Sequence, residues 1–82
     1  MSDDLSADVI GLVETVSDAA RGSVRAQSRF DGLENWDSMR ALRLFNAIEQ
    51  RLGVHLDLRA YLKTADVAGL VELVAAATVG AV

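Results

Sequence analysis

The chain has 82 residues and a net charge of −4, a size that fits one domain with a modest core. It has no cysteine and one histidine, which argues against a disulfide framework and against an all-protein zinc site. An acidic chain without a basic stripe is a poor nucleic-acid binder, and no apolar run is long enough to span a membrane. The acidic start of the chain is also unlike a signal peptide. We therefore expect one soluble, cytoplasmic domain over residues 1–82.

The acidity is concentrated at the beginning of the chain. Residues 1–18 hold five acids and no base, so residues 19–82 together carry a charge of +1. Within the first 20 positions, six apolar residues recur at helical spacing: Leu5, Val9, Leu12, Val13, Val16 and Ala20. This pattern predicts a first helix that begins near Ser2 or Asp3, or after a cap at Ser6. Gly22 is the predicted stop, with Arg21 in the last turn.

A long connection follows over residues 22–37. It is polar, but four apolar residues interrupt it, namely Val24, Phe30, Leu33 and Trp36. A long loop in a small domain is usually functional or disordered, and these apolar residues favour an ordered loop held against the helices. Arg21, Arg25 and Arg29 recur every four residues. We interpret them as a solvated face, with a phosphate or partner contact as the alternative.

The strongest helical pattern covers residues 38–52, and Gly53 is its predicted C-terminal cap. The predicted inward face consists of Met39, Leu42, Phe45, Ile48 and Leu52, widened by Ala41 and Leu44. The predicted outward residues are Arg40, Arg43, Ala47, Gln50 and Arg51. This helix is the rigid element on which the residues around its start are presented.

Two further helices complete the pattern. After the apolar connection Val54-His55-Leu56, Asp57 can cap a short helix over about residues 58–63, with Leu58 and Leu62 as its apolar residues. Thr64 is the predicted cap of a fourth helix, with Asp66 in its first turn. The buried stripe of this helix is Val67, Leu70, Val71 and Val74. We therefore predict an all-α, small four-helix bundle with three main helices, one short helix and a long first loop.

Ser38 stands at the start of the strongest helix. A serine in this position is usually just an N-cap, but Asp37 is an equally good cap and leaves the serine hydroxyl free. The unpaired N–H groups and positive dipole end of a helix start also suit a phosphodiester. Catalysis by a serine would need His55, the only imidazole, and nothing in the sequence brings the two together. We expect no autonomous active site, while a small hydrolase using Ser38 and His55 remains open until their separation is known.

The residues around Ser38 resemble those of acyl carrier proteins. The triplet Asp37-Ser38-Met39 resembles the Asp-Ser-Leu motif of that family. The surrounding order is similar too: an acidic first helix, a long loop with Phe30, and then the serine-led helix. The stretch Arg51-Leu52-Gly53-Val54-His55-Leu56 resembles the family's Phe-Gly-Ile segment, and a short helix and a Thr-x-x-Val start follow it. The resemblance spans about residues 5–77, and Trp36 before the triplet is similar to discrete carriers of specialised metabolism.

The resemblance implies that Ser38 carries 4′-phosphopantetheine, transferred from coenzyme A by a separate phosphopantetheinyl transferase that supplies catalysis and Mg²⁺. The thiol of the arm then holds an acyl or aminoacyl group as a thioester, and tethering raises its effective concentration at each partner enzyme. Asp37 would cap the helix and help the transferase bind metal, while Met39 and Trp36 would pack beside the arm or simply fill the core. The chain itself would hold no metal and would not be an enzyme.

The charges on the predicted second helix depart from the family pattern. Fatty-acid carriers present acids there, whereas this chain presents Arg40 and Arg43. We therefore predict a discrete, monomeric carrier of polyketide or nonribosomal peptide biosynthesis, served by an acyl- or aminoacyl-loading enzyme and a downstream synthase or transferase. The predicted partner-binding residues are Arg40, Arg43, Leu44 and Ala47. The alternative is an unmodified helical interaction module that binds an acidic partner, with Ser38 as an N-cap.

Overall fold

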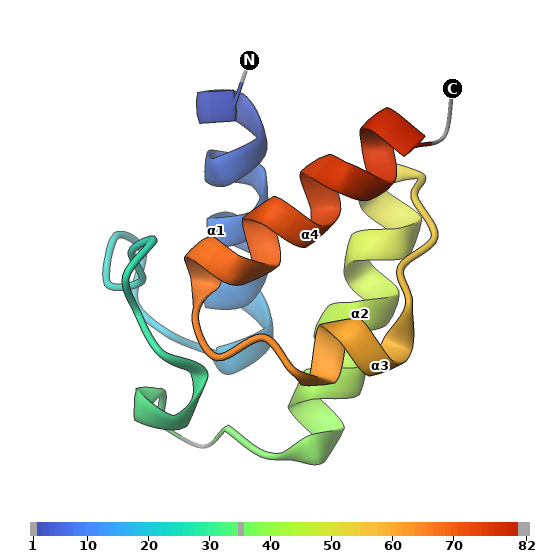
Figure 1. The fold of residues 1–82 in the computed structure, drawn as a ribbon. Coiled ribbons are helices and arrows are strands. Elements are labelled where there is room, and N and C mark those ends of the chain that lie inside the picture. The colour runs from blue at the N-terminus through green and yellow to red at the C-terminus, as the bar shows by residue number, and fades with distance from the viewer. Residues whose placement is uncertain (1, 35, 81–82) are drawn as a thin grey trace.

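Four α-helices and one short 3-10 helix make up the described part of the chain, residues 2–34 and 36–80, in this computed structural model (Figure 1). The α-helices are α1 (Ser2–Ser17), α2 (Ser38–Leu52), α3 (Leu58–Leu62) and α4 (Val67–Gly80), and the 3-10 helix is η1 (Phe30–Gly32). Helix α1 packs against both α2 and α4, and α3 packs against α4. The predicted all-α bundle with three main helices, a short helix and a long first loop is confirmed.

Helix α1 ends at Ser17, before the predicted stop at Gly22. Asp18 adopts a left-handed conformation with φ 59°, and the Ala19 N–H donates to the Glu14 carbonyl at 2.9 Å. This is the pairing of a Schellman motif, which usually has glycine at the left-handed position. Aspartate tolerates that conformation better than most residues, so the helix stops without a glycine. The predicted end of this helix is therefore wrong.

The segment between α1 and α2 is held by hydrogen bonds to α1 and to the segment that leads into α4. The Glu14 carboxylate accepts hydrogen bonds from the backbone N–H groups of Gly22 and Val24, at 2.7 and 3.2 Å. Farther along, the Phe30 N–H donates to the Ala65 carbonyl at 3.1 Å, just before α4. Val24 and Phe30 are both buried. The prediction of an ordered loop held by its apolar residues is confirmed.

Helix α2 has the predicted bounds, and Gly53 ends it in a left-handed conformation with φ 66°. The orientation of the helix differs from the prediction in part. Leu44 and Ile48 are fully buried, but Met39 and Leu42 are 65% and 49% exposed. The helix carries apolar residues around most of its circumference, so spacing alone did not identify the buried face.

The starts of α3 and α4 show one correct and one wrong cap. The Asp57 side chain accepts a hydrogen bond from the Arg59 N–H and caps α3 as predicted. For α4, the predicted cap Thr64 is wrong, because its hydroxyl donates back to the Tyr61 carbonyl at 2.7 Å. Asp66 is the cap instead, and its carboxylate accepts from the Gly69 N–H at 2.8 Å. Helix α4 therefore begins at Val67.

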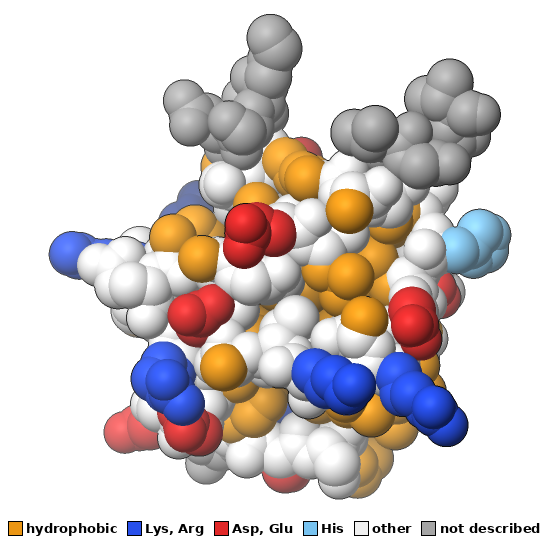
Figure 2. Space-filling view, in the orientation of Figure 1, with side chains coloured by type: hydrophobic (Ala, Val, Ile, Leu, Met, Phe, Trp, Pro, Cys, Tyr) orange, Lys and Arg blue, Asp and Glu red, His pale blue; other side chains and the backbone are white. Residues whose placement is uncertain are grey.

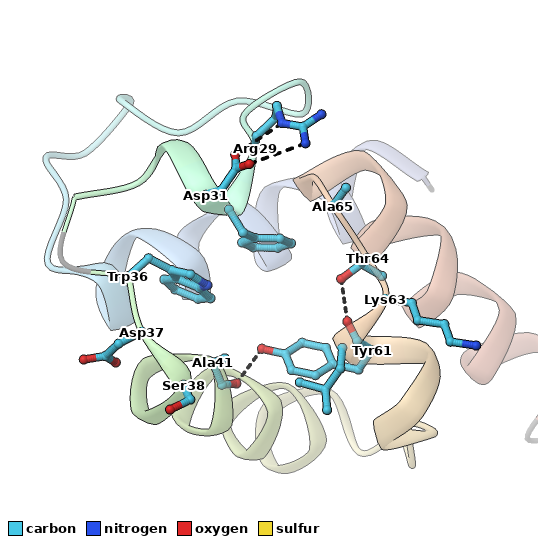
Figure 3. A pocket seen from close by; sticks show the side chains of 12 residues that line it. Arg29, Asp31, Trp36, Asp37, Ser38, Ala41, Tyr61, Lys63, Thr64 and Ala65 are labelled. Carbon is cyan, nitrogen blue, oxygen red and sulfur yellow. Dashed lines mark hydrogen bonds and ion pairs between the residues drawn. The ribbon is translucent and has the colours of Figure 1, made fainter.

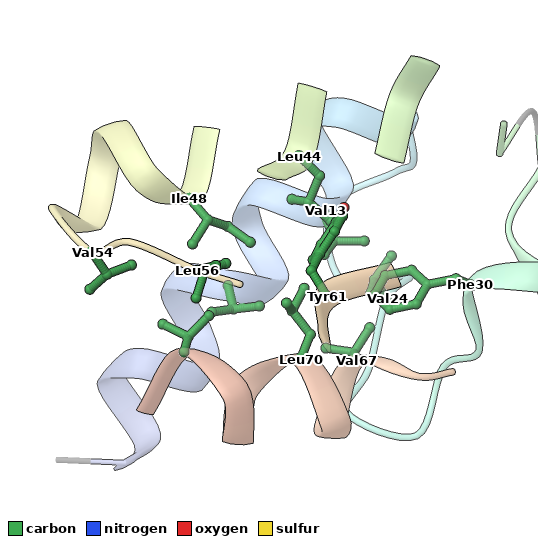
Figure 4. Packing of buried hydrophobic residues seen from close by; sticks show 12 residues of the cluster. Val13, Val24, Phe30, Leu44, Ile48, Val54, Leu56, Tyr61, Val67 and Leu70 are labelled. Atoms are coloured by element: carbon green, nitrogen blue, oxygen red, sulfur yellow. The ribbon is translucent and has the colours of Figure 1, made fainter. Parts of the chain in front are cut away.

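The hydrophobic core lies where α1, α2 and α4 meet, with α3 and the first loop closing one end (Figure 4). Its buried members are Val9, Val13, Val24, Phe30, Leu44, Ile48, Val54, Leu56, Tyr61, Val67, Leu70 and Val74. On α3 the buried position belongs to Tyr61, while Leu58 and Leu62 face solvent. Within the described residues, no helix combines the length and apolar character needed to cross a membrane.

Candidate functional site

At the start of α2, one residue caps the helix and the next residue carries a free hydroxyl. The Asp37 carboxylate accepts a hydrogen bond from the Arg40 N–H at 2.9 Å, so Asp37 is the N-cap. Ser38 is exposed, and its hydroxyl has no hydrogen-bond partner among residues 2–34 and 36–80. If a serine capped the helix, its hydroxyl oxygen would be engaged in that hydrogen bond. Here the hydroxyl remains available for chemistry at a fixed position.

Two contacts from other elements brace the first turns of α2. The Tyr61 hydroxyl, from α3, donates a hydrogen bond to the Ala41 carbonyl, and the rings of Tyr61 and Phe45 lie 5.2 Å apart. Burial raises the pKa of Tyr61, so its hydroxyl stays a protonated donor at neutral pH. On the other side, Arg40 Nη1 donates to the Val16 carbonyl at 2.6 Å, at the C-terminal end of α1. A cation is favourable there because it meets the negative end of the helix dipole.

A cavity of about 500 Å³ opens beside Ser38 (Figure 3). Its walls come from three parts of the chain: η1 and its flanks, the start of α2, and α3 with the segment that leads to α4. The lining residues are Arg29, Phe30, Asp31, Trp36, Asp37, Ser38, Ala41, Tyr61, Leu62, Lys63, Thr64 and Ala65. A volume of this size lies within the range of small-ligand pockets, roughly 300–1,000 Å³.

Aromatic rings form opposite walls of this cavity. Trp36 stacks on Phe30 with ring centroids 5.2 Å apart and an interplanar angle of 22°. Figure 3 shows Trp36 and Tyr61 on either side of the opening, with Ser38 at the start of the helix below them. At the outer rim, Arg29 pairs with Asp31 at 3.2 Å, and this hydrogen bond raises the pKa of Arg29. The cavity thus combines a mainly apolar interior with a charged rim.

Three of the four residues predicted to bind the prosthetic group meet at this cavity. Trp36, Asp37 and Ser38 all line it. Met39 does not line it, and its side chain is largely exposed on α2. Its exposure rules out the interpretation that Met39 fills the core, while packing beside the arm stays a prediction.

The four residues predicted to bind partners have different surroundings. Leu44 is fully buried, so its assignment to a docking surface is wrong; it lies on the core side of α2. Arg40 is half-buried and its guanidinium already bonds the Val16 carbonyl. Ala47 is half-buried as well. Arg43 is exposed, and no ion pair involves it within the described residues.

Sequence reasoning missed the wall of the cavity that α3 contributes. Tyr61 and Leu62 come from that short helix, and Thr64 and Ala65 from the segment after it. The sequence held one signal for this wall, namely Tyr61, the only tyrosine, which lies three residues after Leu58 in the predicted short helix. That spacing puts both on neighbouring positions of a helix, but it does not show which of them turns inward.

The structure excludes a hydrolase built on Ser38 and His55. Ser38 is the first residue of α2, and His55 follows its C-terminal end. A helix of this length separates its ends by about 20 Å. The His55 side chain is fully exposed, and its Nδ1 lies 3.9 Å from the Glu49 carboxylate. The two side chains therefore cannot exchange a proton, and the hydrolase hypothesis is excluded.

Comparisons with known proteins point to the same part of the chain. A protein family described as "Phosphopantetheine attachment site" matches residues 7–74, which include Ser38 and every residue that lines the cavity. Among solved structures, the chain is similar to the "Solution Structure of Oxytetracycline Acyl Carrier Protein". The TM-score is 0.71 and the sequence identity 29%, over 95% of this chain and 84% of that one. No curated protein shows significant sequence similarity to the chain.

Proposed function

The chain belongs to the phosphopantetheine attachment-site family, and we propose that it carries acyl intermediates as thioesters on an arm joined to the Ser38 hydroxyl. Family membership confirms the predicted prosthetic group, 4′-phosphopantetheine, and confirms that the chain is an acyl carrier rather than an enzyme. When bound, this group supplies a thiol on a long arm. The position of the attachment within the chain is our proposal.

One observation carries the assignment of Ser38. Because Asp37 caps α2, the neighbouring hydroxyl is exposed and free of hydrogen bonds to the described residues. The other serines with described hydroxyl bonds are engaged: Ser17 and Ser23 donate to backbone carbonyls, and Ser28 accepts from the Arg25 N–H. Among these four serines, only Ser38 combines exposure, a free hydroxyl and a rigid helix behind it.

The surroundings of Ser38 fit the prosthetic group. The N–H groups of Ser38 and Met39 have no acceptor among the described residues, and they lie at the positive end of the α2 dipole, which suits a phosphodiester. The cavity beside them has an aromatic wall from Trp36 and Phe30. In this proposal, Trp36 provides an apolar surface for the arm or its cargo, and Asp37 holds the helix start in place and assists the transferase's metal.

The pathway class rests on the structural similarity. The similar structure belongs to a carrier named for oxytetracycline, which is a polyketide, and it is alike over most of both chains. This similarity supports a role in polyketide biosynthesis over the nonribosomal peptide alternative. Partners would then be a phosphopantetheinyl transferase, an acyl-loading enzyme and a downstream synthase. We also propose that the chain acts as a monomer in the cytoplasm.

The proposal is tested by the intact mass of the purified chain before and after incubation with coenzyme A and a broad-range phosphopantetheinyl transferase. We expect a gain of one arm per chain. Ser38→Ala should abolish the gain, whereas the matched control Ser23→Ala, in an exposed loop, should keep it. A gain that survives Ser38→Ala would overturn the attachment site, and no gain in the wild-type chain would leave the unmodified interaction module as the better interpretation.

A further inference from the structure

Two residues that line the cavity beside Ser38 are also members of the hydrophobic core. Phe30 and Tyr61 are 8% and 4% exposed, whereas every other residue that lines the cavity is half-buried or exposed. The rings of these two residues therefore form the boundary between the outer cavity and the interior of the bundle. Whether a group carried beside Ser38 can enter the core depends on this boundary.

On the side of the first loop, the boundary is two rings thick. Trp36 stacks on Phe30 with ring centroids 5.2 Å apart, and both residues line the cavity. The Phe30 N–H donates to the Ala65 carbonyl at 3.1 Å, which holds the ring in place from the backbone. This side of the cavity is therefore closed by a pair of stacked rings that is fixed to the segment before α4.

On the side of α3, a single ring forms the boundary. The Tyr61 ring packs against Phe45 of α2, with centroids 5.2 Å apart and an interplanar angle of 58°, and its hydroxyl donates to the Ala41 carbonyl. Figure 3 shows the Tyr61 side chain lying across the space between α3 and α2. The ring is thus anchored on one helix by its backbone and on the other by its hydroxyl.

The interior next to Tyr61 is apolar. Leu44 and Ile48, the buried residues of α2, and Leu56, in the connection before α3, belong to the same buried cluster as Tyr61 (Figure 4). In such surroundings, moving one CH₂ group out of water changes an equilibrium by about fourfold. An alkyl chain would therefore be strongly retained there if the Tyr61 ring did not occupy the entrance.

The outer cavity offers different surroundings. Its rim carries the ion pair between Arg29 and Asp31 and the exposed Lys63. Figure 2 shows acidic and basic side chains interspersed with apolar ones on the face that carries α3 and α4 in Figure 1. Aromatic walls with polar groups at the rim suit a compact acyl group that has keto or hydroxyl oxygens. They do not shield a long saturated chain from water.

From this arrangement we propose that Tyr61 is a specificity-determining residue for the cargo. Its ring closes the interior of the bundle, so the chain holds compact, oxygen-bearing acyl groups in the outer cavity and does not take a long saturated chain into its core. The ring provides the block, and the hydrogen bond to Ala41 keeps the ring in position. This inference rests on the proposed carrier function, since cargo reaches the cavity on an arm joined to Ser38.

The test compares a short and a long saturated cargo on the same arm. The chain is incubated with a broad-range phosphopantetheinyl transferase and either acetyl- or octanoyl-coenzyme A, and the intact mass checks that one loaded arm is present. Hydroxylamine then cleaves the thioester, and each rate is divided by the rate for the same free coenzyme A thioester, which leaves only shielding by the protein. In the wild-type chain the two cargoes should be shielded equally, within about twofold, because no methylene is buried.

Removal of the ring should open the interior to the long cargo. On Tyr61→Ala, the octanoyl thioester should be shielded at least roughly tenfold more than the acetyl thioester, because two buried methylenes already correspond to about that factor. The thermal midpoint of this variant should also be higher with octanoyl than with acetyl, since the chain fills the space left by the ring. Tyr61→Leu makes a smaller opening and should show the same direction. It replaces Tyr61→Ala if circular dichroism shows that the alanine variant does not fold.

Two control variants separate closure by the ring from a loosened core. Tyr61→Phe keeps the ring and loses the hydroxyl, so it should shield the two cargoes equally, as the wild-type chain does. Leu70→Ala makes a hole in the same core but leaves Tyr61 in place, and Leu70 does not line the cavity. It should lower the thermal midpoint without any dependence of shielding on cargo length.

Three results would overturn the role of Tyr61. The first is a wild-type chain that shields octanoyl roughly tenfold more than acetyl, since the interior would then already be open. The second is equal shielding of the two cargoes in the folded alanine or leucine variant. The third is a gain in octanoyl shielding that is as large in Leu70→Ala as in the Tyr61 variants. Failure of the proposed carrier function looks different, because then neither loaded arm appears in the mass of the wild-type chain.

Discussion

Helices α2 and α4 both begin after an aspartate cap, yet the first residue of α2 is exposed and the first residue of α4 is buried. At α4, Asp66 caps the helix, and the first loop closes the turn: the Val67 N–H donates to the Ser28 carbonyl and the Ala68 N–H to the Ala26 carbonyl. Val67 itself is fully buried. At α2, Asp37 caps the helix in the same way, but Ser38 is exposed beside a cavity.

The difference shows how a common capping geometry serves two purposes. At α4 the helix start is a structural joint, since every described N–H group of the first turn has a partner. At α2 the cap leaves the next residue free, and the braces from Tyr61 and Arg40 act farther along the helix. An exposed hydroxyl on a rigid helix start is what covalent attachment of an arm requires.

The largest expected difference between the two starts is in side-chain burial. Leu70, in the first turns of α4, is fully buried, so Leu70→Ala should lower the free energy of unfolding by about 2–5 kcal/mol. Met39→Ala, in the first turn of α2, should change it by less than about 0.5 kcal/mol. Chemical denaturation of both variants measures the two values. Similar losses would show that the two helix starts are equally part of the core.

The two caps should differ by a smaller amount. Asp66 is half-buried and Asp37 is exposed, so we expect Asp66→Ala to cost about 1–2 kcal/mol and Asp37→Ala about 0.5–1 kcal/mol. Asp37→Asn keeps a capping oxygen and should retain nearly full stability. If Asp37 also assists the transferase, Asp37→Asn will slow arm attachment while the thermal midpoint stays unchanged. Unchanged attachment kinetics would restrict Asp37 to capping.

The hydrogen bond that joins α3 to α2 should stabilise the fold by a similar amount. Tyr61→Phe keeps the ring against Phe45 but removes the hydrogen bond to the Ala41 carbonyl, which should cost about 1 kcal/mol. Ala41 lies one turn from Ser38, so the loss should increase amide hydrogen exchange in the first turns of α2. Exchange that increases equally in α4 would contradict a local brace.

The smallest effect is expected at Ser38 itself. Because its hydroxyl bonds no described residue, Ser38→Ala should change the free energy of unfolding by less than about 0.5 kcal/mol. A capping serine would instead cost about 1 kcal/mol on substitution. The result therefore checks that Asp37, rather than Ser38, caps the helix.

The bounds of a helix were predicted well where its start and stop signals come from the residues at its own ends. Helix α2 has its predicted bounds because Asp37 and Gly53 signal its ends through their own side chain and backbone. The end of α1 was missed because a left-handed Asp18 stops the helix where glycine was expected. The start of α4 was missed because the Thr64 hydroxyl bonds backward to Tyr61, a choice that depends on where α3 lies.

The candidate site was predictable on one side only. Trp36, Asp37 and Ser38 are consecutive, so a sequence motif could identify them together. The opposite wall, with Tyr61 and Leu62, comes from a helix whose orientation is fixed by tertiary packing. The same reason explains Met39 and Leu42, which were predicted on the inward face of α2 and are exposed, and Leu44, which was predicted to bind partners and is buried. Periodicity gives the spacing of a stripe, but the neighbours of a small helix decide which stripe is buried.

The most direct test of the central claim is to locate the arm on the wild-type chain. After reaction with coenzyme A and the transferase, cleavage at arginine releases a peptide covering residues 30–40, in which Ser38 is the only serine. Fragmentation of this peptide by mass spectrometry should place the 4′-phosphopantetheine on Ser38. An arm found on a peptide that holds any other serine would contradict the account.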